Sequence, residues 1–117
     1  MLRIYTDGSC IGNPGPGGWA AIILEANSKK TLHGREDNTT NNRMELTAVI
    51  KGLDAIPIDA EVTVFSDSKY VINSMTHNWK RKANGDLWRK LDAQTHNRAV
   101  QWEWVRGHDG DLLNEEA

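Results

Sequence analysis

The hydrophobic pattern of this chain changes its period once, and that change limits the folds open to it. Before Arg43 the apolar residues alternate or cluster in short β-rich runs, as in LRIYTD, WAAIILE and KTLHGRE. After Arg43 they recur at helical spacing over residues 46–53, until Pro57 ends the pattern. Strands followed by alternating helices and strands predict a layered α/β domain.

The order of the elements predicts how the sheet is connected. Short links between the first three runs predict an antiparallel meander. Further along, EVTVFS and AVQWEWV are predicted strands, while SDSKYVINSM and DLWRKLDAQTHN are predicted helices, the second with Asp86 as its N-cap. Connections through helices favour right-handed parallel crossovers, so we expect a mixed sheet. At 117 residues we expect one domain, residues 1–117.

Composition argues against a membrane protein and gives little sign of a partner. No apolar run approaches the roughly 18 residues of a membrane span, and the Met1 end has no signal-peptide pattern. Because Cys10 is the only cysteine, we expect a reducing, cytoplasmic setting. The net charge of −2 is uninformative about nucleic acids. Five basic residues within 80–90 fit a solvated helix face (Lys80, Arg81, Lys82, Arg89, Lys90).

Three acidic residues lie at positions where α/β sheets commonly carry active sites, near the carboxyl ends of strands. Asp7 follows the apolar run of the first strand, Asp67 follows that of the fourth, and Glu45 lies in the first turn of the long helix. If the two strands are parallel neighbours, both aspartates emerge at the same carboxyl edge, toward which Glu45 can turn. Such a cluster repels itself unless a proton or a divalent cation intervenes. Hard oxygen ligands favour Mg²⁺ or Mn²⁺.

Each acid also has an ordinary structural interpretation. Asp7 with Gly8 is a common turn, Glu45 suits a helix N-terminus, and Asp67 with Ser68 suits an N-cap. The stretch GNPGPGG lacks the ending of a phosphate-binding P-loop and by itself is only a turn. The functional interpretation therefore depends on the three acids meeting at one edge.

Four separated motifs resemble type 1 ribonuclease H in type, order and spacing: YTDGSCIGNPGPGGWAAII, TTNNRMEL, SDSKYV and WEWVRGH. The resemblance implies an RNase H-like α/β fold, with a five-stranded mixed sheet in the order 3-2-1-4-5 flanked by helices. It also implies hydrolysis of the RNA strand of RNA·DNA hybrids, leaving 5′-phosphate and 3′-hydroxyl ends. Two ions, Mg²⁺ or Mn²⁺, would clamp the phosphodiester.

The resemblance also assigns catalytic positions residue by residue. Asp7, Glu45 and Asp67 match the metal-binding carboxylates, and Gly8 is placed with them at the metal. His108 matches a loop histidine thought to manage a proton or product release, for which a group that titrates near neutrality is suited.

Positions that read the substrate match as well. Residues in and near the glycine loop would read 2′-hydroxyls and bases in the minor groove (Ser9, Cys10, Asn13, Asn41). Others would grip a DNA phosphate (Thr40, Asn84) or line a channel for the DNA strand (Trp79, Lys80). Of the remaining tryptophans, we assign three to the core and one to either core or surface (Trp88, Trp102 and Trp104; Trp19).

The chain departs from the family pattern in two places. Residues 74–86 are short beside the basic protrusion of many relatives, so we expect weaker hybrid binding with a shallower salt dependence. The sequence also stops at NEEA, about one position before a fourth carboxylate, with the C-terminal helix missing or cut short.

Three interpretations of this ending stay open. The chain is a fragment or an engineered truncation; or it is a naturally short enzyme in which another acid substitutes (Asp109, Asp111, Glu115, Glu116 or the carboxylate of Ala117); or it is a catalytically weak hybrid-binding or assembly domain. Loss of the helix would uncover an apolar sheet patch of about 300–600 Å². We therefore expect a homodimer partner to cover it.

Overall fold

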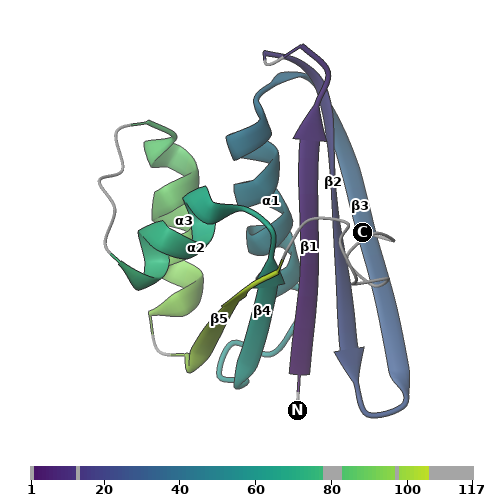
Figure 1. Cartoon of the computed structure of the whole chain (residues 1–117). Helices are drawn as coiled ribbons and strands as arrows, with labels where there is room; N and C mark the ends of the chain where they lie inside the picture. Colours follow the sequence, from purple (N-terminus) through teal and green to yellow (C-terminus); the bar gives the residue numbers. More distant parts are fainter. Residues whose placement is uncertain (1, 13, 78–82, 97, 106–117) are drawn as a thin grey trace.

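The computed structural model describes residues 2–12, 14–77, 83–96 and 98–105. Its strands are β1 (Leu2–Cys10), β2 (Gly15–Glu25), β3 (Ser28–Thr39), β4 (Val62–Ser66) and β5 (Val100–Trp104). Its helices are α1 (Asn41–Asp54), α2 (Lys69–Thr76) and α3 (Gly85–Thr95). The strands form one sheet in the order β3-β2-β1-β4-β5, as the resemblance implies (Figure 1).

The sheet is mixed, and its parallel pairs determine which edge of the sheet carries the candidate site. Strands β1, β2 and β3 form an antiparallel meander, whereas β4 pairs in parallel with both β1 and β5. The carboxyl ends of β1 and β4 therefore point to the same edge, where open α/β sheets bind ligands. In the described part of the chain, no helix is long and apolar enough to cross a membrane.

Helix α1 covers one face of the sheet and forms most of the core with it. Its buried stripe includes Leu46, Val49 and Leu53, each 0% exposed. These side chains belong to one apolar cluster with Ile4 and Val64 of the sheet, also 0% exposed. Burying an aliphatic side chain of this size contributes about 1.5–3 kcal/mol, so this layer holds the helix on the sheet.

On the opposite face of the sheet, the described residues do not form the uncovered apolar patch that we expected. Alternation turns Tyr5, Ala20 and Ile22 away from α1, yet they are only 7%, 8% and 0% exposed. Tyr5 also stacks on Phe65, with ring centroids 4.4 Å apart. Large exposed apolar side chains among the described residues are scattered (Ile11, Ile58, Trp104). For these positions the structure therefore gives no support to a homodimer.

Several predicted boundaries differ from the structure, and three of the differences concern candidate site residues. Strand β1 continues beyond Asp7 to Cys10, because the ladder with β2 continues to that point. Glu45 lies in the second turn of α1, since the helix begins at Asn41. The N-cap of α3 is Asn84 rather than Asp86, whose carboxylate is instead engaged by an arginine of α1.

The tryptophans divide according to their place in the sheet and helices. Trp88 is 3% exposed, and Trp19 and Trp102 are half-buried against the core. Trp104 is 42% exposed, so its assignment to the core is wrong. It is the last residue of β5, the end strand of the sheet, where fewer neighbours cover a side chain.

Arg98 ties the end of α1 to the start of β5. It is 9% exposed, and its guanidinium donates to the carbonyls of Leu53 (3.3 Å), Pro57 (2.9 Å) and Ile58 (3.0 Å). These carbonyls belong to the last residues of α1 and the turn that follows. A cation there also complements the negative end of the helix dipole.

Replacing Arg98 by lysine should destabilise the fold. A lysine ammonium lacks the planar fork that serves three carbonyls, so we expect Arg98→Lys to lower the free energy of unfolding by about 2 kcal/mol. Urea denaturation with an unchanged slope is the measurement. Arg89→Lys, at an exposed position of α3, should change it by no more than about 0.5 kcal/mol. Equal stability of the two variants would contradict this role.

Candidate active site

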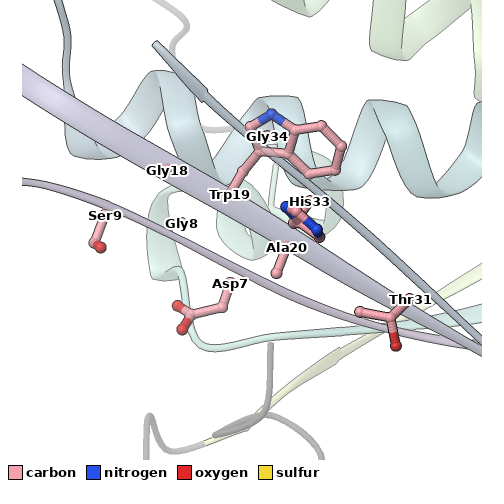
Figure 2. A pocket seen from close by; sticks show the side chains of 9 residues that line it. All are labelled: Asp7, Gly8, Ser9, Gly18, Trp19, Ala20, Thr31, His33 and Gly34. Atoms are coloured by element: carbon pink, nitrogen blue, oxygen red, sulfur yellow. The ribbon is translucent and has the colours of Figure 1, made fainter. Parts of the chain in front are cut away.

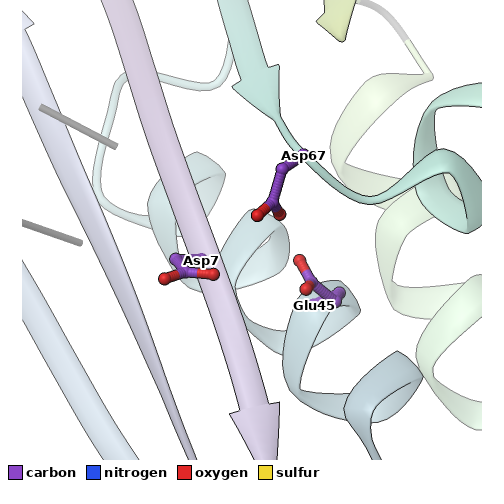
Figure 3. A group of neighbouring side chains, drawn as sticks. All are labelled: Asp7, Glu45 and Asp67. Atoms are coloured by element: carbon purple, nitrogen blue, oxygen red, sulfur yellow. The ribbon is translucent and has the colours of Figure 1, made fainter. Parts of the chain in front are cut away.

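Three elements bring three carboxylates together at the edge of the sheet. Asp7 lies in β1, Asp67 directly follows β4, and Glu45 lies on α1. One carboxylate oxygen from each residue lies within 4.8 Å of the others. Figure 3 shows the three side chains turned toward one another. The parallel pairing of β1 with β4 brings the two aspartates to one edge, as the strand order predicts.

Gly8 allows α1 to come close enough for this meeting. A Cβ atom added at Gly8 would lie 2.4 Å from the carbonyl carbon of Met44 and 2.6 Å from the backbone nitrogen of Glu45. These are backbone atoms of the helix, so a side chain would push α1 away from β1. The absence of a side chain at Gly8 therefore sets the distance between Glu45 and Asp7.

Glu45 is a residue of the cluster whose pKa is strongly affected by burial and by the neighbouring charges. Its Oε2 is shielded from solvent and has no hydrogen-bond partner among the described residues. Burial, reinforced by the charges of Asp67 and Asp7, raises the pKa of Glu45 to about 9. In the metal-free protein Glu45 therefore holds a proton at neutral pH. A buried, unsatisfied oxygen among three hard ligands fits a divalent cation such as Mg²⁺ or Mn²⁺.

A cavity of about 350 Å³ opens beside Asp7. Its lining comes from three neighbouring strands (Asp7, Gly8, Ser9, Gly18, Trp19, Ala20, Thr31, His33 and Gly34; Figure 2). His33 belongs to none of the sequence motifs. Its place follows from the register, because Ala20 pairs with both Asp7 and His33. The proximity of His33 to Asp7 can be predicted only when the alignment of the three strands is known, and no sequence motif indicates it.

The glycine loop is joined to the start of α1. The backbone N–H of Cys10 donates to Asn41 Oδ1 at 2.7 Å. The structure thus brings together two of the residues that we expect to read the minor groove. Ser9, a third, is exposed beside them in β1. Their role in reading a duplex stays a prediction.

Thr40 and Asn84, the expected phosphate grip, are linked through Arg43. Thr40 caps α1 by accepting from the Arg43 N–H at 3.2 Å, and the Arg43 guanidinium donates to Asn84 Oδ1 at 3.3 Å. It also forms a two-pronged ion pair with Asp86, at 3.0 and 2.8 Å. This pairing raises the pKa of Arg43 and holds the pKa of Asp86 well below its usual range. Arg43 lies inside TTNNRMEL but is not among the site residues predicted from the sequence.

Several predicted site residues lie outside the described part of the chain. They are the loop histidine, one glycine-loop residue, the two channel residues and the candidate substitute acids (His108; Asn13; Trp79 and Lys80; Asp109, Asp111, Glu115, Glu116 and Ala117). Their roles stay predictions.

Comparison with known proteins places this arrangement in a family. The family model described as RNase H matches residues 1–117. The ribonuclease H of Bordetella pertussis is 48% identical over 130 positions, covering 100% of this chain and 84% of the relative. That alignment is longer than the 117 residues of the chain, so the relative contains additional residues within the matched region. This agrees with the expectation of a shortened internal segment.

Solved structures share the fold. LC9-RNase H1, a type 1 RNase H with the type 2 active-site motif, is 34% identical with a TM-score of 0.86, covering 99% of this chain and 67% of that one. LC11-RNase H1, solved in complex with an RNA/DNA hybrid, is 24% identical with a TM-score of 0.86, covering 99% and 92%. With the full-length family match and the three acids at the sheet edge, the chain belongs to the RNase H family, as a type 1 member.

Proposed function

We propose that residues 1–117 act as a single catalytic domain that hydrolyses the RNA strand of RNA·DNA hybrids with two divalent cations, leaving 5′-phosphate and 3′-hydroxyl ends. The observation that carries this proposal is the acid cluster. Asp7, Glu45 and Asp67 offer carboxylate oxygens within 4.8 Å of one another, and Glu45 Oε2 is buried without a hydrogen-bond partner among the described residues. Membership of the RNase H family supports the assignment of nuclease activity.

The protein's own part is to hold the cluster in place. When bound, the cations would supply Lewis-acid chemistry, activating the attacking water and stabilising the departing 3′-oxygen. Asp7, Glu45 and Asp67 would hold them, and Glu45 would release its proton on binding, because its raised pKa reflects the lack of a counter-charge. Gly8 keeps α1 close enough for Glu45 to take part. Mg²⁺ and Mn²⁺ both suit this ligand set.

Recognition of the hybrid would involve the two clusters beside the acids. Ser9, Cys10 and Asn41 would contact the minor groove, where the 2′-hydroxyl distinguishes RNA from DNA. Thr40 and Asn84 would grip a DNA phosphate, and the Arg43 guanidinium, which donates to Asn84 and pairs with Asp86, would hold Asn84 in place for this contact. A protein of the same fold, LC11-RNase H1, has been solved with an RNA/DNA hybrid.

The remaining roles belong to the same proposal. Asn13 would join the minor-groove contacts, Trp79 and Lys80 would line the channel for the DNA strand, and His108 would manage a proton or product release. A cytoplasmic location is proposed because the chain has a single cysteine and so forms no internal disulfide.

The loss of one acid should separate cleavage from binding. With a labelled RNA·DNA hybrid in Mg²⁺ or Mn²⁺, Asp7→Asn is expected to lower the cleavage rate at least about 100-fold, because a direct ligand matters more than an outer one. Hybrid affinity should change little. Asp37→Asn, with a side chain 93% exposed, is the matched control. If both variants cleave equally, the catalytic proposal fails; hybrid binding without cleavage in the unmodified chain would indicate a binding module.

The raised pKa of Glu45 predicts how stability depends on pH. The folded metal-free protein binds the Glu45 proton more tightly than the unfolded chain, so this contribution is fully present below about pH 4.3 and is lost as pH rises toward about 9. In EDTA, Glu45→Gln should therefore raise the free energy of unfolding by about 1–3 kcal/mol at pH 7 and flatten its fall with pH. Urea denaturation from pH 5 to 9 measures this. Glu61→Gln, at an exposed position, should keep the wild-type slope.

Without EDTA, Mg²⁺ should raise the thermal midpoint of the wild type but not that of the Asp7→Asn variant. A cation that binds only the folded state adds about 2.7 kcal/mol at a concentration one hundred times its Kd. The measurement is the thermal midpoint with and without Mg²⁺ at constant ionic strength. A similar rise in both proteins would point to binding elsewhere.

A further inference from the structure

The peptide bond that follows Asp67 is held at both ends by side chains. The Asp67 carbonyl accepts a hydrogen bond from Trp104 Nε1 at 3.2 Å. The N–H of Ser68, at the other end of the same peptide unit, donates to Ser66 Oγ at 3.0 Å. Because a peptide unit is planar, it cannot rotate without breaking one of these bonds. The backbone on the carboxyl side of Asp67 is therefore held at two points.

The groups that hold this peptide are themselves anchored in the sheet. Ser66 is 0% exposed and pairs with Trp104 in the parallel ladder between β4 and β5. The N–H of Val105 donates to the Ser66 carbonyl at 2.9 Å. On the far side, Ser68 caps α2 by accepting from the Val71 N–H at 3.2 Å. The turn that carries Asp67 thus lies between a strand ladder and a helix N-terminus.

Trp104 contacts Asp67 and Lys69, in and next to the turn between β4 and α2. Its ring is 42% exposed, so burial alone does not explain a tryptophan at this position. Its indole N–H is directed at the Asp67 carbonyl, and Lys69 Nζ lies over its ring, 5.1 Å from the centroid. Both partners lie on the turn between β4 and α2 or in the first turn of α2.

We propose that Trp104 and Ser66 are positioning residues for Asp67, which hold its carboxylate in the geometry that a divalent cation requires. This inference rests on the proposed function of the acid cluster. In the absence of a cation, the negative charges of Asp7 and Asp67, which offer oxygens within 4.8 Å of each other, repel. Asp67 follows the end of its strand, so it would turn away from the other two unless its backbone were held. The clamp opposes that movement and lowers the ordering cost of cation binding.

The test removes one hydrogen bond and keeps the ring. Trp104→Phe retains an aromatic face for Lys69 but has no N–H for the Asp67 carbonyl. Isothermal titration calorimetry with Mn²⁺ and no nucleic acid should give a Kd about tenfold weaker than wild type, the lower end of the range for outer-shell partners. Ser66→Ala, which removes the other holder, should weaken Mn²⁺ binding similarly. It also supplies the test if Trp104→Phe does not fold.

Lys69→Met is the matched control. It removes the cation over the ring and leaves the indole N–H in place. Since it also removes a positive charge near the acids, Mn²⁺ should bind with unchanged or slightly tighter affinity. A general loss of structure around Trp104 would instead weaken binding in all three variants and would overturn the proposal.

The outcomes distinguish this inference from the proposed function. If Asp7→Asn abolishes Mn²⁺ binding while folded Trp104→Phe and Ser66→Ala stay within twofold of wild type, the clamp has no role and only this inference falls. If Asp7→Asn leaves wild-type binding unchanged, the metal site itself is refuted, and the inference falls with it. Weakened binding in both clamp variants, together with an intact Lys69→Met, supports the proposal.

Discussion

Mutual repulsion among three carboxylates is the constraint on which the functional edge depends. One oxygen from each of Asp7, Glu45 and Asp67 lies within 4.8 Å of the others, and Glu45 responds with a pKa raised to about 9. Without a cation, such a cluster lowers the stability of the fold that displays it. The rest of the structure must therefore hold the acids together against their charges. The clustering of acids that suits the site to a cation lowers the stability of the metal-free fold, a trade-off that is common at functional sites.

Different parts of the fold restrain different acids. Asp7 pairs with Ala20 of β2 and directly follows Thr6, the last residue of β1 that pairs with β4, so the sheet fixes its backbone. Glu45 is carried by α1, whose apolar stripe packs on the sheet and whose approach depends on Gly8. Asp67 alone lies in a turn, where the restraint comes from side chains of β4 and β5. The acid in the least regular backbone is thus the one whose peptide bond is clamped.

Much of the architecture could be predicted from the sequence, and the errors have physical causes. Period and turn residues predicted the strands and helices, and the motifs predicted the sheet order. The N-cap of α3 was missed because Arg43, distant in the sequence, takes the carboxylate of Asp86. Trp104 was assigned to the core because hydrophobicity alone does not say which strand ends the sheet. The homodimer expected from the sequence has no support in the structure, because Tyr5 and Ile22 are buried on the face expected to be bare.

The sequence by itself determined the local chemistry: which residues are acids, where the chain turns, and which runs are apolar enough to be strands or an amphipathic helix. These properties depend on residues near one another in the chain, so they can be identified without coordinates. Only the tertiary structure decided how closely Asp7 and Asp67 approach each other. The same is true of the alignment of Asp7, Ala20 and His33 across three strands and of the contact between Trp104 and the Asp67 carbonyl. Those depend on strand register and on how closely helix and sheet pack, which arise from long-range contacts and leave no local pattern.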